Sequence, residues 1–258
     1  MIAVVKIGGG IIEDEKQLSA FLTSFAQLKG PKVLVHGGGR LATSLGARMG
    51  ITANMVEGRR VTDEATLELV TMVYGGLANK KIVAQLQASG INALGLSGAD
   101  GNVILSHKRA VKKVDYGWVG DVETVNVLLL ETLLNQGVVP VLAPLTHDGK
   151  GNMLNTNADT IASELAKALA QSGKETQLIF GFELNGVLRD FEDKSSVIAE
   201  INSSTYQDLK AKGVIADGMI PKLDNAFQAI NAGVKSVRIC HALKVGSANA
   251  AENGTLIL

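Results

Sequence analysis

The sequence contains little that would suit an oxidising or membrane environment. It has one cysteine, Cys240, among 258 residues, which excludes an internal disulfide framework. No apolar run is long enough to span a membrane, and no basic and then apolar leader precedes the first strand-like segment. These absences predict a cytoplasmic protein that makes no contact with a membrane.

The chain also lacks an excess of charge of either sign. Lysine plus arginine and aspartate plus glutamate number 25 each, so no overall field attracts nucleic acid. Any anionic ligand must therefore be held by local groups. We expect small-molecule substrates and no nucleic-acid partner.

Motifs for metal binding and for nucleophilic catalysis are missing as well. The histidines His36, His107, His147 and His241 have no metal-ligand spacing, and neither H-E-x-x-H nor C-x-x-C occurs. There is no G-x-S-x-G nucleophile elbow. We therefore predict no metal site built from protein side chains.

Segments that favour strands alternate with segments of helical spacing. We expect strands at 2–7, 32–36, 93–96, 138–142, 178–182, 237–240 and 255–258, and helices at 18–28, 41–49, 63–77, 125–134, 159–171, 205–212 and 222–232. Such alternation predicts an α/β fold with a mostly parallel sheet covered on both faces. A polar break near residue 173 divides the chain into lobes 1–174 and 175–258.

Two glycine triplets follow the first two predicted strands, Gly8-Gly9-Gly10 and Gly37-Gly38-Gly39. Glycine between a strand and a helix lets the backbone approach an anion closely and points free N–H groups at it. Lys6 lies in the first strand and should emerge at its carboxyl end, where ligands bind in open α/β sheets. Phosphate is the leading candidate, although the second triplet, Gly37–Gly39, could also be a tight turn with nothing bound.

The second triplet also fits another class of protein. Residues 37–42 satisfy the G-x-G-x-x-A dinucleotide fingerprint, and Glu57 stands about twenty residues on, where a ribose-binding acid belongs. An NAD-binding oxidoreductase is therefore an alternative. That fingerprint explains neither the first triplet nor Lys6.

Three further segments carry polar groups with both structural and functional interpretations. Arg59-Arg60 could clamp a carboxylate or could be solvated surface. In the segment 155–159, Asn157 or Asp159 could cap a helix, or Asn155 could donate to a ligand while Asp159 holds lysine ammonium groups. Lys222 follows Pro221 in the first turn of a predicted helix, an unfavourable place for a cation unless an anion binds there.

Taken together and in order, these segments resemble the amino-acid kinases. The motifs that carry the resemblance are 6–9 (KIGG), 36–39 (HGGG), 58–62 (GRRVT), 155–159 (NTNAD) and 217–222 (DGMIPK), with further similar segments at 79–80, 96–101 and 114–120. The resemblance runs nearly end to end. It implies a three-layer αβα sandwich with a mainly parallel open sheet. It also implies transfer of phosphate from MgATP to the γ-carboxylate of an N-acylated glutamate, N-acetyl-L-glutamate foremost, in arginine biosynthesis.

The resemblance implies a role for each matching residue. Lys6 and Lys222 would flank the transferring phosphoryl group, and Asp159 would organise the two lysines. Gly8, Gly9, Gly37 and Gly38 would offer N–H groups to phosphate and γ-carboxylate oxygens, and Arg60 and Asn155 would hold the α-carboxylate. Glu183 and Gly186 fall in the segment expected at the nucleotide. The N-terminal lobe would bind the acylated amino acid and form a homodimer, and the C-terminal lobe would bind ATP.

The sequence departs from the family pattern in two places. Phe182-Glu183 stands where members usually carry a Ser/Thr-Asp pair near the nucleotide. The chain begins directly in its first strand, without the extra helix of the hexameric members that arginine inhibits, so we expect a homodimer that arginine does not inhibit. N-succinylglutamate or an aminoadipate derivative as substrate, and a catalytically silent amino-acid sensor, remain alternatives.

Overall fold

The computed structural model describes residues 1–215, 219–248 and 253–258 of the chain. Asp217 and Gly218, which belong to the motif before Lys222, lie outside the described residues.

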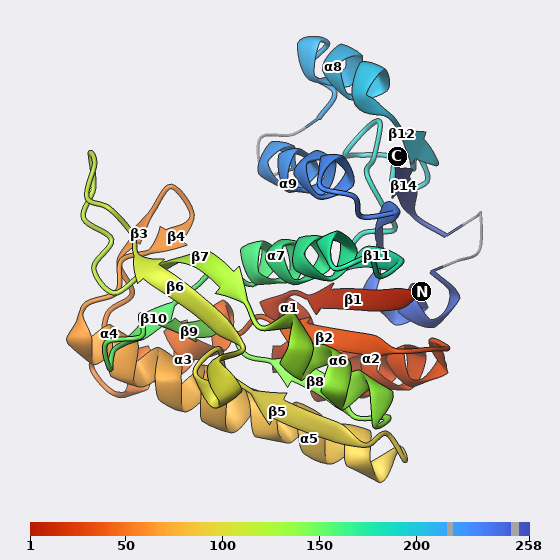
Figure 1. The fold of residues 1–258 in the computed structure, drawn as a ribbon. Coiled ribbons are helices and arrows are strands. Elements are labelled where there is room, and N and C mark those ends of the chain that lie inside the picture. The colour runs from red at the N-terminus through yellow and green to blue at the C-terminus, as the bar shows by residue number, and fades with distance from the viewer. Residues whose placement is uncertain (216–218, 249–252) are drawn as a thin grey trace.

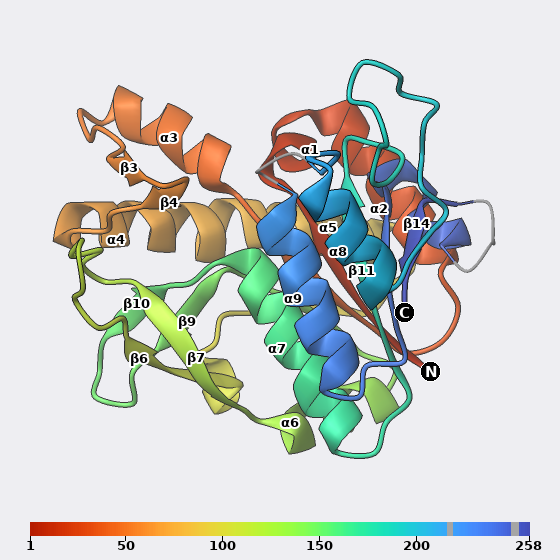
Figure 2. The same ribbon diagram turned by 90° about the horizontal axis from the view of Figure 1, so that it is seen from above.

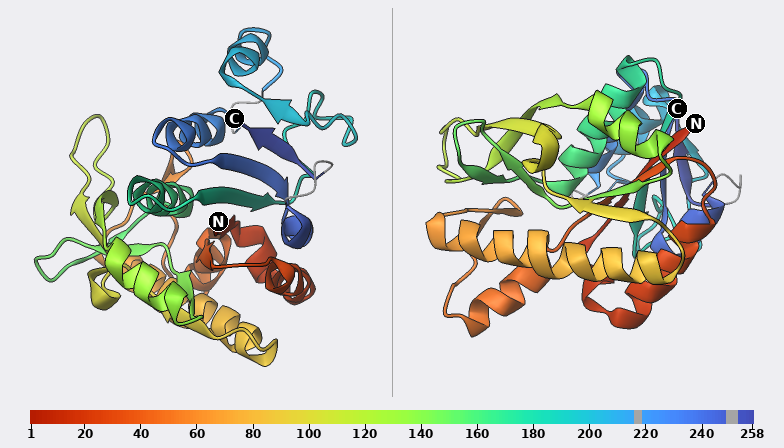
Figure 3. Two further views of the ribbon diagram at one scale, coloured as in Figure 1. Left: turned by 45° about the vertical axis from the view of Figure 1, so that its right-hand side comes forward. Right: turned by 60° about the horizontal axis from the view of Figure 1, so that its bottom comes forward.

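The core of the fold is an eight-stranded sheet that spans both halves of the chain (Figure 1). Its order is β12 (Glu200–Ile201), β14 (Thr255–Ile257), β13 (Ser236–His241), β11 (Thr176–Phe182), β1 (Ile2–Ile7), β2 (Lys32–His36), β8 (Val139–Leu142) and β5 (Ala93–Leu96). Neighbouring strands are parallel except β13 and β14. The mainly parallel sheet is therefore confirmed, and Figure 3 (left) shows its C-terminal strands continuing from the rest.

Helices cover both faces of the sheet, which confirms the three-layer αβα arrangement (Figures 1 and 2). One apolar core packs the sheet against α6 (Val127–Asn135), α7 (Ala158–Gln171), α8 (Ser203–Ala211) and α9 (Ile220–Asn231). The opposite core packs it against α1 (Gly9–Glu13), α2 (Glu15–Gln27), α5 (Asn79–Ala88) and the 3₁₀ helix η3 (Ala242–Ser247). Side chains of β1 alternate between these cores, with Val4 in the first and Val5 in the second. Lys6 therefore faces the side of α7.

The remaining elements lie beyond the carboxyl ends of β1 and β2, at the left of Figure 1. A smaller sheet has the order β10 (Met153–Asn155), β9 (Leu145–His147), β6 (Ile104–Lys108) and β7 (Gly120–Val125), with the 3₁₀ turn η2 (Asp100–Asn102) before β6. Beside it are α3 (Gly39–Arg48) and a hairpin of β3 (Met55–Val56) and β4 (Arg59–Arg60). These elements supply one wall of the site described below.

The structure differs from the sequence prediction in three helices. The helix expected to end at residue 77 runs on: α4 (Glu64–Val70) continues through a π-helical segment, η1 (Thr71–Ala78), into α5 (Figure 3, right). The five-residue helix α1 was not predicted, because its glycines are poor helix formers. The helix expected from 125 begins at Val127, since Val125 belongs to β7, a strand that was not predicted.

Side-chain caps occur at two of the predicted helix starts. Asp63 accepts from the N–H of Thr66 and caps α4, and Asn157 accepts from the N–H of Thr160 and caps α7. Within the described residues, no helix is both long and apolar enough to cross a bilayer.

Candidate active site

The two glycine turns leave the sheet side by side. β1 lies between β2 and β11, and in the parallel register Ile7 pairs with His36 on one side and Gly181 on the other. The first turn, the second turn and the segment after β11 therefore begin at the same level of the sheet. This is the carboxyl edge, where a parallel α/β sheet forms its ligand crevice.

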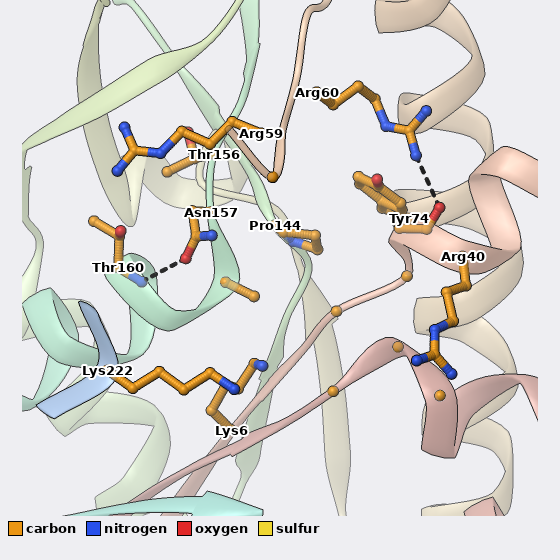
Figure 4. Close-up of a pocket in the computed structure, with 18 of the residues that line it drawn as sticks. Lys6, Arg40, Arg59, Arg60, Tyr74, Pro144, Thr156, Asn157, Thr160 and Lys222 are labelled. Atoms are coloured by element: carbon orange, nitrogen blue, oxygen red, sulfur yellow. Dashed lines mark hydrogen bonds between the residues drawn. The ribbon is translucent and has the colours of Figure 1, made fainter. Parts of the chain in front are cut away.

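A cavity of about 770 Å³ opens at this edge (Figure 4). It is lined by ten of the eleven residues that the family resemblance assigns to the site: Lys6, Gly8, Gly9, Gly37, Gly38, Arg60, Asn155, Glu183, Gly186 and Lys222. The eleventh, Asp159, lies behind the wall and contacts Lys6. The fold thus brings together segments that are up to 216 residues apart, from Lys6 to Lys222.

The two lysines approach the cavity from adjacent layers of the protein, Lys6 from β1 in the sheet and Lys222 from α9 in the helical layer beside it (Figure 4). The Lys6 ammonium lies 2.7 Å from a carboxylate oxygen of Asp159, and its side chain is only 9% exposed. Both ammonium groups lie over the ring of Phe182, at 5.6 Å for Lys6 and 3.8 Å for Lys222. The ring face attracts cations, so Phe182 helps to hold the pair near one point.

Burial lowers the pKa of the Lys222 ammonium below its ordinary 10.5, because a charge loses hydration there. The carboxylate of Asp159 opposes this change, the cation of Lys6 adds to it, and the carboxylate of Glu183 opposes it more weakly. Two cations held so close together would be stabilised by a polyanion.

The glycine turns face each other across a narrow gap. A Cβ atom placed on Gly9 would lie 3.5–3.7 Å from the backbone nitrogens of Gly38, Gly39 and Arg40. Those amides belong to the start of α3, where N–H groups have no acceptor within the helix. They form a cradle for an anion opposite the first turn.

Gly37 differs from its expected role. Its N–H donates to the carbonyl oxygen of Ile7 at 3.0 Å, so it joins β1 to the second turn and is not available to a ligand. The three amides that follow it are placed for that contact instead. Gly37 still lines the cavity, and a Cβ atom there would lie 3.2 Å from the nitrogen of Gly9.

Arg60 lies at the N-terminal-lobe side of the cavity and is only 8% exposed. Its Nη2 donates to the carbonyl oxygen of Gly39 at 2.9 Å and to Thr43 Oγ1 at 2.8 Å. Asn155 Nδ2 donates to Thr62 Oγ1 at 3.0 Å, close to the same strand. Both side chains are thus fixed before any ligand arrives, a preorganised arrangement that suits recognition of a carboxylate.

Glu183 and Gly186 stand at the opposite side, after β11. Glu183 is about half exposed and lies 3.5 Å from Arg40. A Cβ atom on Gly186 would lie 2.8 Å from Thr255 and Val197 atoms, so its small size is required by packing. Glu57, the acid of the dinucleotide alternative, is at the tip of the β3–β4 hairpin with φ +50° and does not line the cavity.

The cavity is strongly cationic although the chain is neutral overall. Among the described residues that line it, Lys6, Arg40, Arg59, Arg60, Arg109 and Lys222 face a single acid, Glu183. Helices α3, α7 and α9 also present their N-terminal ends there, which adds positive potential. The arrangement can bring two anions together and stabilise negative charge between them.

Sequence reasoning missed Tyr74, Arg40 and Arg109. Tyr74 lies behind Gly38, where an added Cβ atom would be 2.8 Å from the ring, and its hydroxyl faces Arg60 (Figure 4). Its spacing from Val70 and Val73 is that of a helical core position, so the sequence carried no signal for it. Arg40 follows the second triplet and could have been named from that position.

His36 supports the second turn from inside the protein. It is fully buried, its Nε2 accepts from Asn79 Nδ2 at 3.1 Å, and its Nδ1 donates to the carbonyl oxygen of Gly37 at 2.7 Å. Asn79 also donates to Val141, which fixes the orientation of its amide. Burial lowers the pKa of His36 to about 4, so the ring is neutral at pH 7.

Comparison with known proteins places this geometry in a family. The profile of the Amino acid kinase family matches residues 1–241. The chain is 60% identical over 240 residues to the acetylglutamate kinase of Cytophaga hutchinsonii, covering 93% of this chain and 90% of that protein. It is 59% identical over 256 residues to the acetylglutamate kinase of Bacteroides fragilis, covering 99% and 96%. A solved structure from Streptococcus mutans superposes with a TM-score of 0.75 at 30% identity, covering 99% of this chain and 98% of that one.

Proposed function

The chain belongs to the amino acid kinase family, and from this premise we propose that it transfers the γ-phosphoryl group of ATP to the γ-carboxylate of N-acetyl-L-glutamate. The product is N-acetylglutamyl 5-phosphate, an intermediate of arginine biosynthesis. As a member of this family, the chain is a phosphotransferase. The observation that carries the substrate assignment is one cavity with two lysines on one side and a preorganised arginine on the other.

The acceptor needs little chemical activation. A glutamate side-chain carboxyl has a pKa of about 4.3, so the nucleophile is already ionised at pH 7 and no general base is required. The barrier arises from bringing an anion to a polyanion and from charge that develops on the transferred group. Positioning and cationic groups lower both costs.

The cavity residues have complementary roles in this proposal. Arg60 and Asn155 bind the α-carboxylate, and the amides of Gly38, Gly39 and Arg40 bind the γ-carboxylate. Gly8 and Gly9 face the phosphates, and Lys6 and Lys222 stabilise the transferring phosphoryl group. Asp159 offsets the cost of holding Lys6 as a buried cation.

We place ATP in the opposite part of the cavity, which is lined by Lys6 of β1, Lys222 of α9 and Glu183 after the end of β11. Among the described residues, no three His, Cys, Asp or Glu side chains cluster as metal ligands. Mg²⁺ is commonly held by substrate phosphates with one or two carboxylates, and Glu183 and Asp159 are the carboxylates near this point. When bound, Mg²⁺ would neutralise charge on the β- and γ-phosphates.

We further propose that residues 1–174 bind the acylated amino acid and that residues 175–258 bind the nucleotide. The sheet supports this division, because β1 has its N-terminal partner β2 on one side and its C-terminal partner β11 on the other. The site then lies where the two halves meet. The single cysteine and the need for ATP support a cytoplasmic location.

A homodimer through the N-terminal lobe is part of the proposal. β5 is an edge strand of the main sheet, and Leu94 on it is 41% exposed. Met72 and Leu77 on η1 are about half exposed. Exposed apolar residues on an edge strand are suited to pairing with a second copy. Leu94→Lys should shift the sedimentation coefficient towards that of a monomer, and a wild-type monomer at micromolar concentration would exclude the dimer.

The reaction is tested by trapping the acyl phosphate as a hydroxamate. Purified protein is incubated with MgATP, hydroxylamine and, in parallel, N-acetyl-L-glutamate, N-succinyl-L-glutamate, N-acetyl-L-aminoadipate and free L-glutamate. We expect hydroxamate with acylated glutamate and little with free glutamate. Hydroxamate from none of these acceptors would exclude the proposed reaction, and the silent-sensor alternative would then remain.

A further inference from the structure

Arg59 and Arg60 are neighbours on β4 but have opposite environments. Successive side chains of a strand point to opposite sides, and Figure 4 shows the two arginines leaving the strand in opposite directions. Arg60 is buried and bonded to Gly39 and Thr43. Arg59 is exposed, yet it also lines the cavity. Its guanidinium therefore faces the same ligand space from the other side of the strand.

Arg59 interacts with the carboxylate of Asp121 only at longer range: the pKa of Asp121 is lowered mainly by its hydrogen bond with Arg109 and only weakly by the charge of Arg59. In the part of the chain that the structure describes, no hydrogen bond is made by its guanidinium and no carboxylate lies within 4.0 Å of it. The nearby Arg109, which also lines the cavity, has its own partner: its Nε donates to both oxygens of Asp121, at 3.1 and 3.2 Å. Asp121 is thus engaged by Arg109, and Arg59 keeps its binding capacity.

In the proposed binding mode, with Arg60 at the α-carboxylate, Arg59 is expected at the far end of the acyl group. Arg60, one residue on, is the proposed partner of the α-carboxylate, and the acyl amide leaves the same α-carbon of the substrate. Val119 and Met55 line this end, and they adjoin the other carboxylate-binding groups: Val119 bridges to Asn155, and Met55 pairs with Arg60. Their apolar surface suits methylene groups that lead from the amide carbonyl to a second charge.

We propose that Arg59 is a specificity-determining residue that binds a carboxylate at the end of the acyl chain. The site then accepts acyl groups derived from dicarboxylic acids, of the succinyl class, as well as the acetyl group. This inference rests on the proposed kinase function and specifies its acceptor. An arginine fork binds a carboxylate with two parallel hydrogen bonds, whereas an acetyl methyl group offers it nothing.

The test measures kcat/KM for N-succinyl-L-glutamate and for N-acetyl-L-glutamate in three proteins: wild type, Arg59→Met and Arg59→Lys. The quantity of interest is the succinyl-to-acetyl ratio of kcat/KM. We expect wild type to use N-succinyl-L-glutamate at least as well as N-acetyl-L-glutamate. Arg59→Met should lower the ratio about 10- to 100-fold, the range that corresponds to losing about 1.4–2.8 kcal/mol from a charge-assisted contact. Arg59→Lys should give an intermediate ratio, since the charge stays and the fork is lost.

Arg48→Met is the matched control, because Arg48 is exposed at the end of α3 and does not line the cavity. It should leave the ratio unchanged. A ratio that Arg59→Met does not alter would overturn the assignment while leaving the kinase intact. A rise in the KM for ATP, equal with both acceptors, would also overturn it, since Arg59 would then serve the nucleotide. If neither N-succinyl-L-glutamate nor N-acetyl-L-glutamate gives acyl phosphate, the kinase function itself would be refuted.

Discussion

Protonation of His36 should destabilise the protein at acid pH by a predictable amount. In the folded state burial lowers the pKa of His36 to about 4, while the hydrogen bond to the Gly37 carbonyl opposes this change and the cation of Lys80 adds to it. In the unfolded chain the ordinary value of 6.5 applies. Between these values the unfolded chain binds more protons than the folded one. Stability therefore falls as pH falls through this window.

The magnitude follows from the two pKa values. At 1.36 kcal/mol per pKa unit, the difference between 6.5 and about 4 corresponds to about 3 kcal/mol of unfolding free energy. The contribution is fully present above pH 6.5 and is lost by about pH 4. That loss is a large part of the roughly 5–15 kcal/mol that stabilises a typical domain.

The assay is urea unfolding of wild type and His36→Asn at several pH values from 7 to 4. The variant loses the contact with Asn79 and is less stable at pH 7. Because it cannot titrate at this position, its disadvantage should shrink by about 3 kcal/mol between pH 7 and pH 4. A stability difference that stays constant over this range would refute the reasoning about burial of the ring.

Three other perturbations test the site. Gly9→Ala places a methyl group in ordinary contact, at 3.5–3.7 Å, with the amide nitrogens at the start of α3, so the unfolding midpoint should be kept while kcat/KM falls about 10²–10³-fold. Gly76→Ala, at a glycine of η1 that has open space around it and does not line the cavity, should show no such loss if the blocked cradle is the cause. Arg60→Lys keeps the charge but loses the fork, so it should mainly raise the KM of the amino acid; an unchanged KM would contradict the α-carboxylate assignment. Because burial lowers the pKa of Lys222, kcat/KM for ATP should decline as the pH rises, and the decline should begin at a pH below the ordinary lysine pKa of 10.5. Lys222→Arg should shift this decline to higher pH. A decline at the same pH in the variant would show that another group titrates.

Much of the fold could be predicted because its signals are local. The strands at 2–7 and 32–36 are buried apolar runs, and the structure has them as β1 and β2 with the same bounds. The start of α4 could be predicted from its N-cap residue, Asp63, whose side chain accepts a hydrogen bond from the first turn. By contrast, α1 has glycines where helix formers are expected, and β7 is half exposed with few apolar residues. Their conformations are set by packing and pairing with β6, which no local pattern records.

The site could be predicted as a set of residues but not as a geometry. The residues that carry charge or lack a side chain, such as Lys6 and Gly9, stand out in an apolar sequence. Contacts that depend on three-dimensional placement cannot be recognised in the sequence in this way. Nothing in the sequence indicated that the ring of Phe182 would lie under both lysines. Nor did it indicate that the carbonyl oxygen of Ile7 would accept a hydrogen bond from the N–H of Gly37. Tyr74 was hidden for the same reason.

The central claim is that phosphoryl transfer takes place between the two lysines, and Lys222→Met tests it most directly. This variant removes one cation and leaves the pair of Lys6 and Asp159 in place. With ATP and an acylated glutamate, we expect kcat to fall about 10²–10³-fold, as for loss of one transition-state donor, with a much smaller change in the KM of the amino acid. Lys29→Met, at an exposed position outside the cavity, should retain wild-type rates. A kcat for Lys222→Met within a few-fold of wild type would contradict the claim.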